Sequence, residues 1–193
     1  MSQLWLYASI SIIFFIPFIF LALFDQKARH NKFDQTLLNK PLNLKLRTRD
    51  IIKDKKFSVN VFEPFSKLSL EFINNFSQEL KKKRETYNFL DLIYLSNWCS
   101  KKKIENFKKR YIFDKNQIGR GLVFHITPSN VPTNFIYSFI FGLLSGNSNI
   151  VKVPNQEFAE KKIILNILKK LLKKKKFKDL YNSNYFISYD KSK

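Results

Sequence analysis

Cysteine, glycine and acidic residues are all scarce in this sequence of 193 residues. A single cysteine, Cys99, excludes an internal disulfide and any cysteine-rich zinc site, so no metal site is expected and cysteine usage indicates no redox compartment. Asp and Glu total 15 against 35 Lys and Arg, which gives a formal net charge of +20. Taken alone, this balance favours an anionic partner such as nucleic acid or a lipid surface.

The residue usage offers a plainer explanation of the charge. Lysine is much commoner than arginine, phenylalanine occurs 21 times and glycine only 4 times, a bias expected of a genome rich in A and T. The lysine runs also lack the interleaved exposed aromatic residues on which nucleic-acid bases stack, so we expect no specific nucleic-acid partner. With 45% hydrophobic residues, the chain can bury a core, and its length allows one domain and an appendage.

Residues 4–24 form an apolar run without a single charge. The run is long enough to span a bilayer, which takes about 20 apolar residues. No Lys or Arg precedes it, which argues against a secretory signal, whereas Lys27, Arg29 and Lys32 follow it directly. By the positive-inside tendency, we expect a single-pass membrane protein whose main body is cytoplasmic. A buried helix of a soluble protein and a misassigned start codon are the alternatives.

A helical or mixed region is expected between residues 25 and 118. Apolar residues recur at helical spacing from Ser66 to Arg84, which predicts one helix, and a second is predicted from Tyr87 to Trp98. Residues 59–65 are compatible with a short strand, and residues 106–117 are expected to be basic and irregular. These patterns predict a helical region ahead of a separate domain.

Strands and helices alternate from residue 119 to the end of the chain. Strands are predicted at 121–126, 149–153 and 185–189, and helices at 135–146 and 157–176. This order, at these lengths, implies a parallel sheet with right-handed crossovers. We therefore expect an α/β fold in which residues 119–193 form a partial Rossmann-type nucleotide-binding domain, with its ligand at the carboxyl ends of the strands.

The helix predicted at 157–176 has one apolar stripe. Its lysines, at positions 161, 162, 169, 170 and 173–176, are expected to lie largely on the opposite face.

Residues 119–154, GRGLVFHITPSNVPTNFIYSFIFGLLSGNSNIVKVP, are the most informative stretch. Four blocks in it, GLVFHI, PSNVP, LLSGNS and IVK, resemble the acyl-CoA reductase family typified by the fatty acyl reductase of bacterial bioluminescence, within the aldehyde dehydrogenase superfamily. Four blocks in order are more specific than a lone glycine pattern. The resemblance implies an aldehyde-dehydrogenase-like fold, and NADPH-dependent reduction of a fatty acyl-CoA to its aldehyde.

The loop after the first predicted strand holds the candidate catalytic residue. Pro128 and Pro132 stiffen this loop, and Asn130 between them places an amide there. By the resemblance, Asn130 donates to the substrate oxyanion and stabilises the tetrahedral thiohemiacetal formed from the acyl-CoA thioester. An asparagine that only caps the following helix is the alternative.

Four residues are candidates for cofactor binding by the same resemblance. Thr127, Pro128 and Ser129 belong to the loop, and Lys152 ends the second predicted strand. The lysine would contact the adenosine ribose or the 2′-phosphate of NADP, as a compact cation suited to an anionic group. One more solvated lysine is the alternative at position 152. We interpret His125 as a core histidine rather than as a general base.

The family's nucleophilic cysteine would lie well downstream of Lys152, beyond a glycine-rich turn. Neither feature occurs before Lys193, and Cys99 stands upstream in a context that matches no family nucleophile. We therefore expect an N-terminal portion (a fragment, a split gene product or a degenerate copy) that needs a partner chain for thiolate chemistry. The competing hypothesis is a catalytically silent, membrane-anchored fragment that acts as an interaction module through its basic face.

Overall fold

The computed structural model describes residues 58–111 and 117–188, all of which belong to one compact unit, Asn39–Lys193. The apolar run at residues 4–24, for which we predicted a membrane helix, lies outside the described residues. Among the described residues, no helix has both the length and the apolar character needed to cross a membrane.

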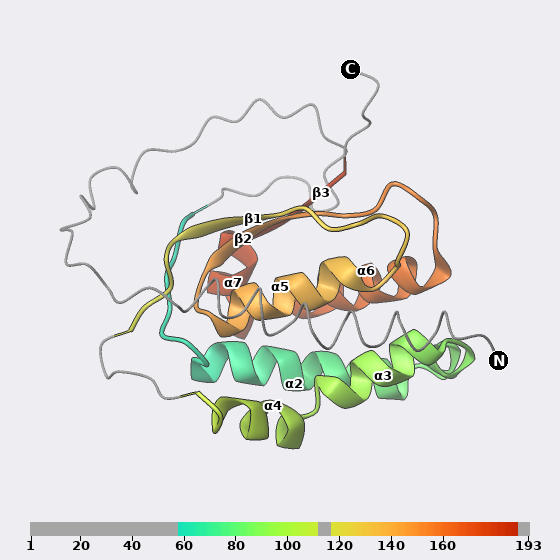
Figure 1. Ribbon diagram of the computed structural model, residues 1–193, viewed down its shortest axis with the longest axis horizontal. Helices are drawn as coiled ribbons and strands as arrows, with labels where there is room; N and C mark the ends of the chain where they lie inside the picture. The colour runs from blue at the N-terminus through green and yellow to red at the C-terminus, as the bar shows by residue number, and fades with distance from the viewer. Residues whose placement is uncertain (1–57, 112–116, 189–193) are drawn as a thin grey trace. The chain divides into compact units, whose positions relative to one another are not determined.

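The described residues form six α-helices and a sheet of three strands (Figure 1). Two short 3₁₀ helices, η2 and η3, complete the order. In chain order the elements are α2 (Lys67–Lys82), η2 (Arg84–Asn88), α3 (Leu90–Trp98), α4 (Lys101–Lys108), β1 (Leu122–His125), α5 (Asn134–Leu144), β2 (Ser148–Lys152), α6 (Ala159–Leu172), η3 (Lys175–Phe177), α7 (Lys178–Ser183) and β3 (Asn184–Ile187).

The sheet is parallel throughout, with strand order β1-β2-β3. Leu122 of β1 lies opposite Ser148 of β2, and Asn149 of β2 lies opposite Asn184 of β3. Helix α5 connects β1 to β2, and α6 and α7 connect β2 to β3. The predicted alternation of strands and helices, the parallel sheet and the α/β class are therefore confirmed.

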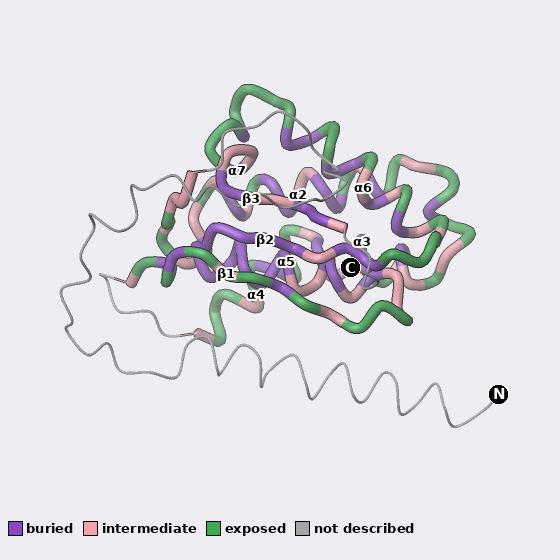
Figure 2. The backbone as a smooth tube through the Cα atoms, turned by 90° about the horizontal axis from the view of Figure 1, so that it is seen from above, coloured by how far each residue is buried: buried purple, intermediate pink, exposed green. Residues whose placement is uncertain are grey.

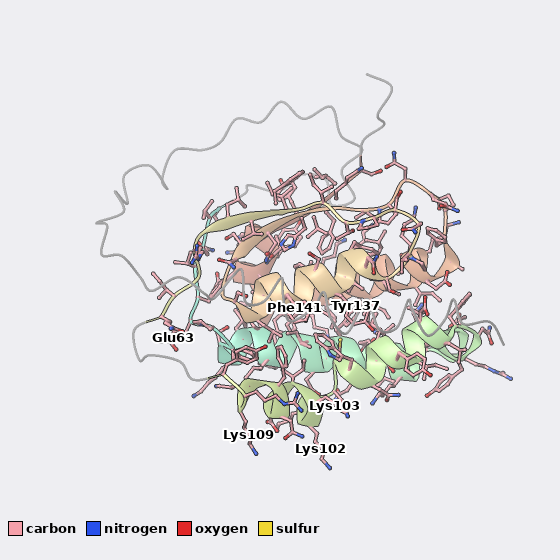
Figure 3. All side chains as sticks on the ribbon, viewed as in Figure 1. Glu63, Lys102, Lys103, Lys109, Tyr137 and Phe141 are labelled. Atoms are coloured by element: carbon pink, nitrogen blue, oxygen red, sulfur yellow. The ribbon has the colours of Figure 1, made fainter. Side chains whose placement is uncertain are left out.

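Helix α5 lies between the sheet and a further layer of helices that contains α2, α3 and α4 (Figure 1). The ring of Phe139 meets Phe186 of β3 at a centroid distance of 4.8 Å and Phe72 of α2 at 6.3 Å. Tyr137 and Phe141 contact the tryptophan that ends α3, on the side of α5 that faces this helical layer (Figure 3). Two packed sides explain why residues 135–146 are apolar almost all round.

Helix α2 confirms the prediction made for Ser66–Arg84, with an end at Lys82. Ser66 caps its N-terminus, because the Ser66 hydroxyl accepts a hydrogen bond of 3.2 Å from the backbone N–H of Ser69. The apolar residues that repeat at helical spacing are buried, as expected of a stripe that faces a core. They are Phe72, Ile73, Phe76 and Leu80.

Two predictions for the helical region were only partly right. The helix expected at Tyr87–Trp98 is two elements, because Phe89 adopts an extended conformation (φ −130°) between η2 and α3. The segment expected to be irregular from residue 106 begins inside helix α4, of which Ile104 is the buried residue. Half of α4 is lysine and its apolar side consists of Ile104 and Phe107 alone, which is too short a repeat to reveal the helix in the sequence.

The segment predicted as a strand at 59–65 is not part of the sheet. It runs beside the turn that follows α5, where the Phe62 N–H donates to the Gly146 carbonyl at 2.9 Å. The Asn60 N–H donates to the Ser148 hydroxyl, also at 2.9 Å. Gly146 has a φ of 78°, and a Cβ there would lie 2.1 Å from the Phe62 carbonyl oxygen, so this close approach requires glycine.

Candidate functional site

The carboxyl ends of β1 and β2 lie at the same edge of the sheet, because the strands are parallel. His125, the last residue of β1, pairs with Val151, so Lys152 stands one position further along this edge. The loop from β1 to α5 begins here, and the loop from β2 to α6 leaves from the neighbouring strand. Figure 2 shows β2 as buried and the loop after β1 as exposed. This edge is where open parallel sheets of this kind bind their ligands.

The four loop residues that the sequence singles out are accessible to a ligand. Pro128, Ser129 and Asn130 are exposed, and Thr127 is half-buried. The Thr127 hydroxyl oxygen is itself buried and has no hydrogen-bond partner among the described residues. A buried hydroxyl without a partner is costly, so this atom is a ready donor or acceptor for a polar ligand group.

Asn130 lies in the turn that precedes α5. The N-cap residue of α5 is Thr133, not Asn130, and the Thr133 side chain makes no capping hydrogen bond. The alternative that Asn130 caps the following helix is therefore wrong. Its amide stands exposed at the sheet edge, where it is available to a molecule bound there.

Lys152 is half-buried at the end of β2 and lies opposite Ile187 of β3. Side chains alternate between the two faces of a strand, and His125 contacts Ser138 of α5. The face shared by His125 and its register partner in β2 is thus the one covered by α5. Lys152 follows that partner by one residue, so it belongs to the opposite face of the sheet, which α5 does not cover.

Lys161 corrects the expectation that the lysines of this helix lie on its solvent face. It is only 6% exposed, and its ammonium group donates to the Pro154 carbonyl at 3.2 Å and to the Gln156 carbonyl at 2.7 Å. A third bond of 3.0 Å goes to the Glu157 carboxylate, whose pKa is lowered chiefly by this hydrogen bond. Lys161 therefore ties the start of α6 to the loop that follows Lys152.

The sequence contained a signal for this burial. Lys161 precedes Ile164 by three residues and Leu168 by seven, which is the spacing of the buried stripe of α6. The prediction nevertheless placed Lys161 with the other lysines on the solvent face, because its side chain is charged. The structure brings Thr127–Asn130 and Lys152 to one edge of the sheet as predicted, and adds Lys161 as the residue that fixes the second loop.

His125 is confirmed as a core residue. Its Nε2 lies 2.8 Å from the Asn149 side-chain oxygen and its Nδ1 lies 2.7 Å from the Ser138 hydroxyl. The Asn149 amide nitrogen already donates to the Asn147 carbonyl and to the Asn184 side-chain oxygen, so its oxygen is left to accept from the imidazole. The proton therefore sits on Nε2, and Nδ1 accepts from the serine.

Burial lowers the pKa of the His125 imidazole, and the hydrogen bond to Asn149 opposes this shift in part. The ring is thus held neutral in one tautomer, with both nitrogens engaged within the protein. A histidine held in this way is suited to a structural role rather than to proton transfer with a substrate.

Cys99 is completely buried beside the helical layer. Burial raises the pKa of its thiol far above the ordinary range, because a thiolate would be poorly solvated there. The side chain is therefore an inert core group, as the sequence indicated. Among residues 58–111 and 117–188, no cluster of His, Cys, Asp or Glu is arranged to hold a metal ion.

Comparison with known proteins gives one match. The family model described as acyl-CoA reductase (LuxC) matches residues 35–190. The match spans most of the chain and includes every candidate residue discussed above. No curated protein and no solved structure matches the chain.

Proposed function

The chain belongs to the acyl-CoA reductase (LuxC) family, and from this membership we propose that residues 119–188 provide the nucleotide-binding part of an NADPH-dependent reductase of fatty acyl-CoA thioesters. The family implies an oxidoreductase that acts on an acyl-CoA with a nicotinamide cofactor. When bound, the nicotinamide cofactor supplies the electrons for the reduction of the thioester to the aldehyde.

The carboxyl edge of the sheet is the observation that carries the proposal. Thr127 offers a buried hydroxyl without a partner among the described residues, and Lys152 offers a cation at the end of the adjacent strand. A polar loop next to a strand-end lysine suits a phosphate-bearing nucleotide. We assign Thr127, Pro128 and Ser129 to the contact with the cofactor, and Lys152 to its ribose or 2′-phosphate.

Asn130 serves the acyl substrate in this proposal. Its exposed amide donates a hydrogen bond to the oxygen of the reacting carbonyl, on which negative charge develops. A preorganised donor of this kind contributes about 10²–10³ in rate. The position of Asn130 supports this role, because Thr133 and not Asn130 is the N-cap residue of α5.

Lys161 acts as a positioning residue. Its three hydrogen bonds hold the loop between Pro154 and Glu157, and the same loop continues directly from Lys152. A fixed loop keeps the strand-end lysine in place before the ligand arrives, which lowers the conformational cost of binding.

The test is the affinity of the full chain for NADPH and NADH, measured by fluorescence titration. Lys152→Ala should weaken NADPH binding by about ten- to a hundredfold, since one charge-assisted contact contributes about 1.5–3 kcal/mol, and should weaken NADH binding less. Lys169→Ala, which removes an exposed lysine near the other end of α6, is the matched control and should change neither affinity. Unchanged NADPH affinity in Lys152→Ala would overturn the cofactor assignment.

A further inference from the structure

A second basic site lies at the opposite edge of the sheet. Seven of the ten residues 169–178 are lysines, in the segment that joins the end of α6 to α7. They surround a pocket of about 270 Å³ that is open to solvent. We call it the lysine pocket, and its lining residues are Leu172, Lys173, Lys174, Lys175, Lys178 and Tyr181.

The lysine pocket is separate from the proposed cofactor edge. Helix α6 starts near the carboxyl ends of the strands and runs for 14 residues, about 21 Å, before it reaches the pocket. Helix α7 then leads directly into Asn184, the first residue of β3, so the pocket lies at the amino-terminal edge. A ligand of the pocket is therefore a different molecule, or a different group, from one held at Lys152.

The lysines that line the pocket form no ion pair within the described residues, although Lys174 is among the lysines whose charge lowers the pKa of the Glu79 carboxyl. Two acidic residues of α2 each bind a lysine beside the pocket: Glu79 lies 2.6 Å from Lys170, and Glu71 pairs with Lys176. Within the described part of the chain, Lys173, Lys174, Lys175 and Lys178 form no ion pair. These four cations lie close together in a concave surface, where they repel one another unless an anion joins them.

The pocket has the size and the chemistry for a phosphate group. Binding pockets for drug-sized molecules occupy about 300–1,000 Å³, so this pocket suits a smaller group. The lysine ammonium is a compact point charge that binds phosphate well, and a phosphomonoester brings about two negative charges. Leu172 and Tyr181 add an apolar and aromatic wall that a bare ion does not need.

We propose that the lysine pocket binds a phosphate-bearing anion, either a soluble phosphate or diphosphate ester or the phosphate of a lipid headgroup. The juxtaposition of Lys173, Lys174, Lys175 and Lys178 around one pocket, with no ion pair to any of them in the part of the chain that the structure describes, carries this assignment. It does not depend on the proposed function, because none of these residues belongs to the cofactor edge.

The experiment titrates the full chain with inorganic pyrophosphate at about 150 mM salt, by isothermal titration calorimetry. Wild type should bind one equivalent. Lys175→Glu with Lys178→Glu should weaken this binding at least about tenfold, because two cationic contacts are reversed. Lys175→Arg with Lys178→Arg keeps the charge and should retain binding.

The matched control is Lys102→Glu with Lys103→Glu on α4. Both lysines are exposed and carry no ion pair among the described residues, and Figure 3 shows Lys102 on the outer side of α4. This variant makes the same change in net charge and should bind pyrophosphate within about threefold of wild type, as expected for a long-range effect alone. Equal losses in the two charge-reversed variants, or no saturable binding by wild type, would overturn the proposal.

Two further arms complete the design. Circular dichroism checks that each variant folds, and Lys175→Gln with Lys178→Gln replaces the reversed pair if that pair disrupts the fold.

Co-sedimentation with vesicles of phosphatidylcholine and phosphatidylserine identifies the source of the phosphate. Loss of vesicle binding only in the pocket variant indicates a lipid headgroup, and equal vesicle binding by both variants indicates a soluble phosphate ester.

Discussion

Lys161 is a charged residue at a position of α6 that belongs to the buried, otherwise apolar stripe of the helix. Lys161→Met keeps the length and the apolar stem of the residue but leaves the Pro154 and Gln156 carbonyls without their donor. We expect a loss of about 2–3 kcal/mol in the free energy of unfolding, because buried acceptors lose charge-assisted hydrogen bonds. Urea denaturation measures this loss.

Lys162→Met is the control at the next residue. Its side chain is 68% exposed and lies 3.6 Å from the same glutamate, so its removal should cost less than about 0.5 kcal/mol. Similar losses in the two variants would mean that Lys161 acts only through its charge on Glu157. The sequence indicated that Thr127 and Asn130 lie in a loop and Lys152 at a strand end. The spacing of Lys161 to Ile164 and Leu168 also pointed to its burial, but the carbonyl partners that make this burial possible leave no pattern in the sequence.

Ser66 and Ser100 are both N-cap residues, of α2 and α4, so their contributions to stability can be compared directly. Ser66 precedes α2 and accepts a hydrogen bond from the Ser69 N–H, whereas Ser100 precedes α4 and makes no capping bond with its side chain. Ser66→Ala should lower the free energy of unfolding by about 1 kcal/mol, and Ser100→Ala by a few tenths at most. Thermal unfolding of both variants checks the difference, and equal effects would exclude the cap as its cause.

Elements with a strong stripe or a run of strand-forming residues were predictable from the sequence. Helix α2 has an apolar repeat that faces the core, and strands β1 and β2 are short runs of strand-forming residues bounded by glycine or proline. Helix α4 was missed because Ile104 alone is buried among lysines. The segment 59–65 was misassigned because its partners, Gly146 and Ser148, are distant in the sequence.

The free energy of unfolding of the whole molecule should decrease as the pH falls below 6.5, because His125 is buried in its neutral form. Its pKa is lowered in the folded state, so between the folded value and 6.5 the unfolded chain binds more protons. Stability is therefore fully present above pH 6.5 and declines as the pH falls toward the folded pKa. Glu79 and Glu157 have pKa values lowered from 4.5, so their contributions are lost only at more acidic pH.

His125→Gln isolates this effect. The glutamine carries no titratable group, so its stability should change little between pH 6.5 and pH 5, whereas wild type should decline across that window. Chemical denaturation at a series of pH values gives both curves. Parallel curves would show that another group causes the decline.

The hydrogen bond between Asn60 and Ser148 joins residues that are 88 positions apart, so it forms only after the segment between them has been synthesised. At about 5–20 residues per second, a ribosome needs about 4–18 seconds to reach the second partner after the first has emerged. During that interval the apolar stripe of α2 lacks α5 and α6, the helices against which it packs. The nascent chain thus exposes the apolar face of α2 before the helices that cover it have been made, and the net positive charge of the chain opposes aggregation during that interval.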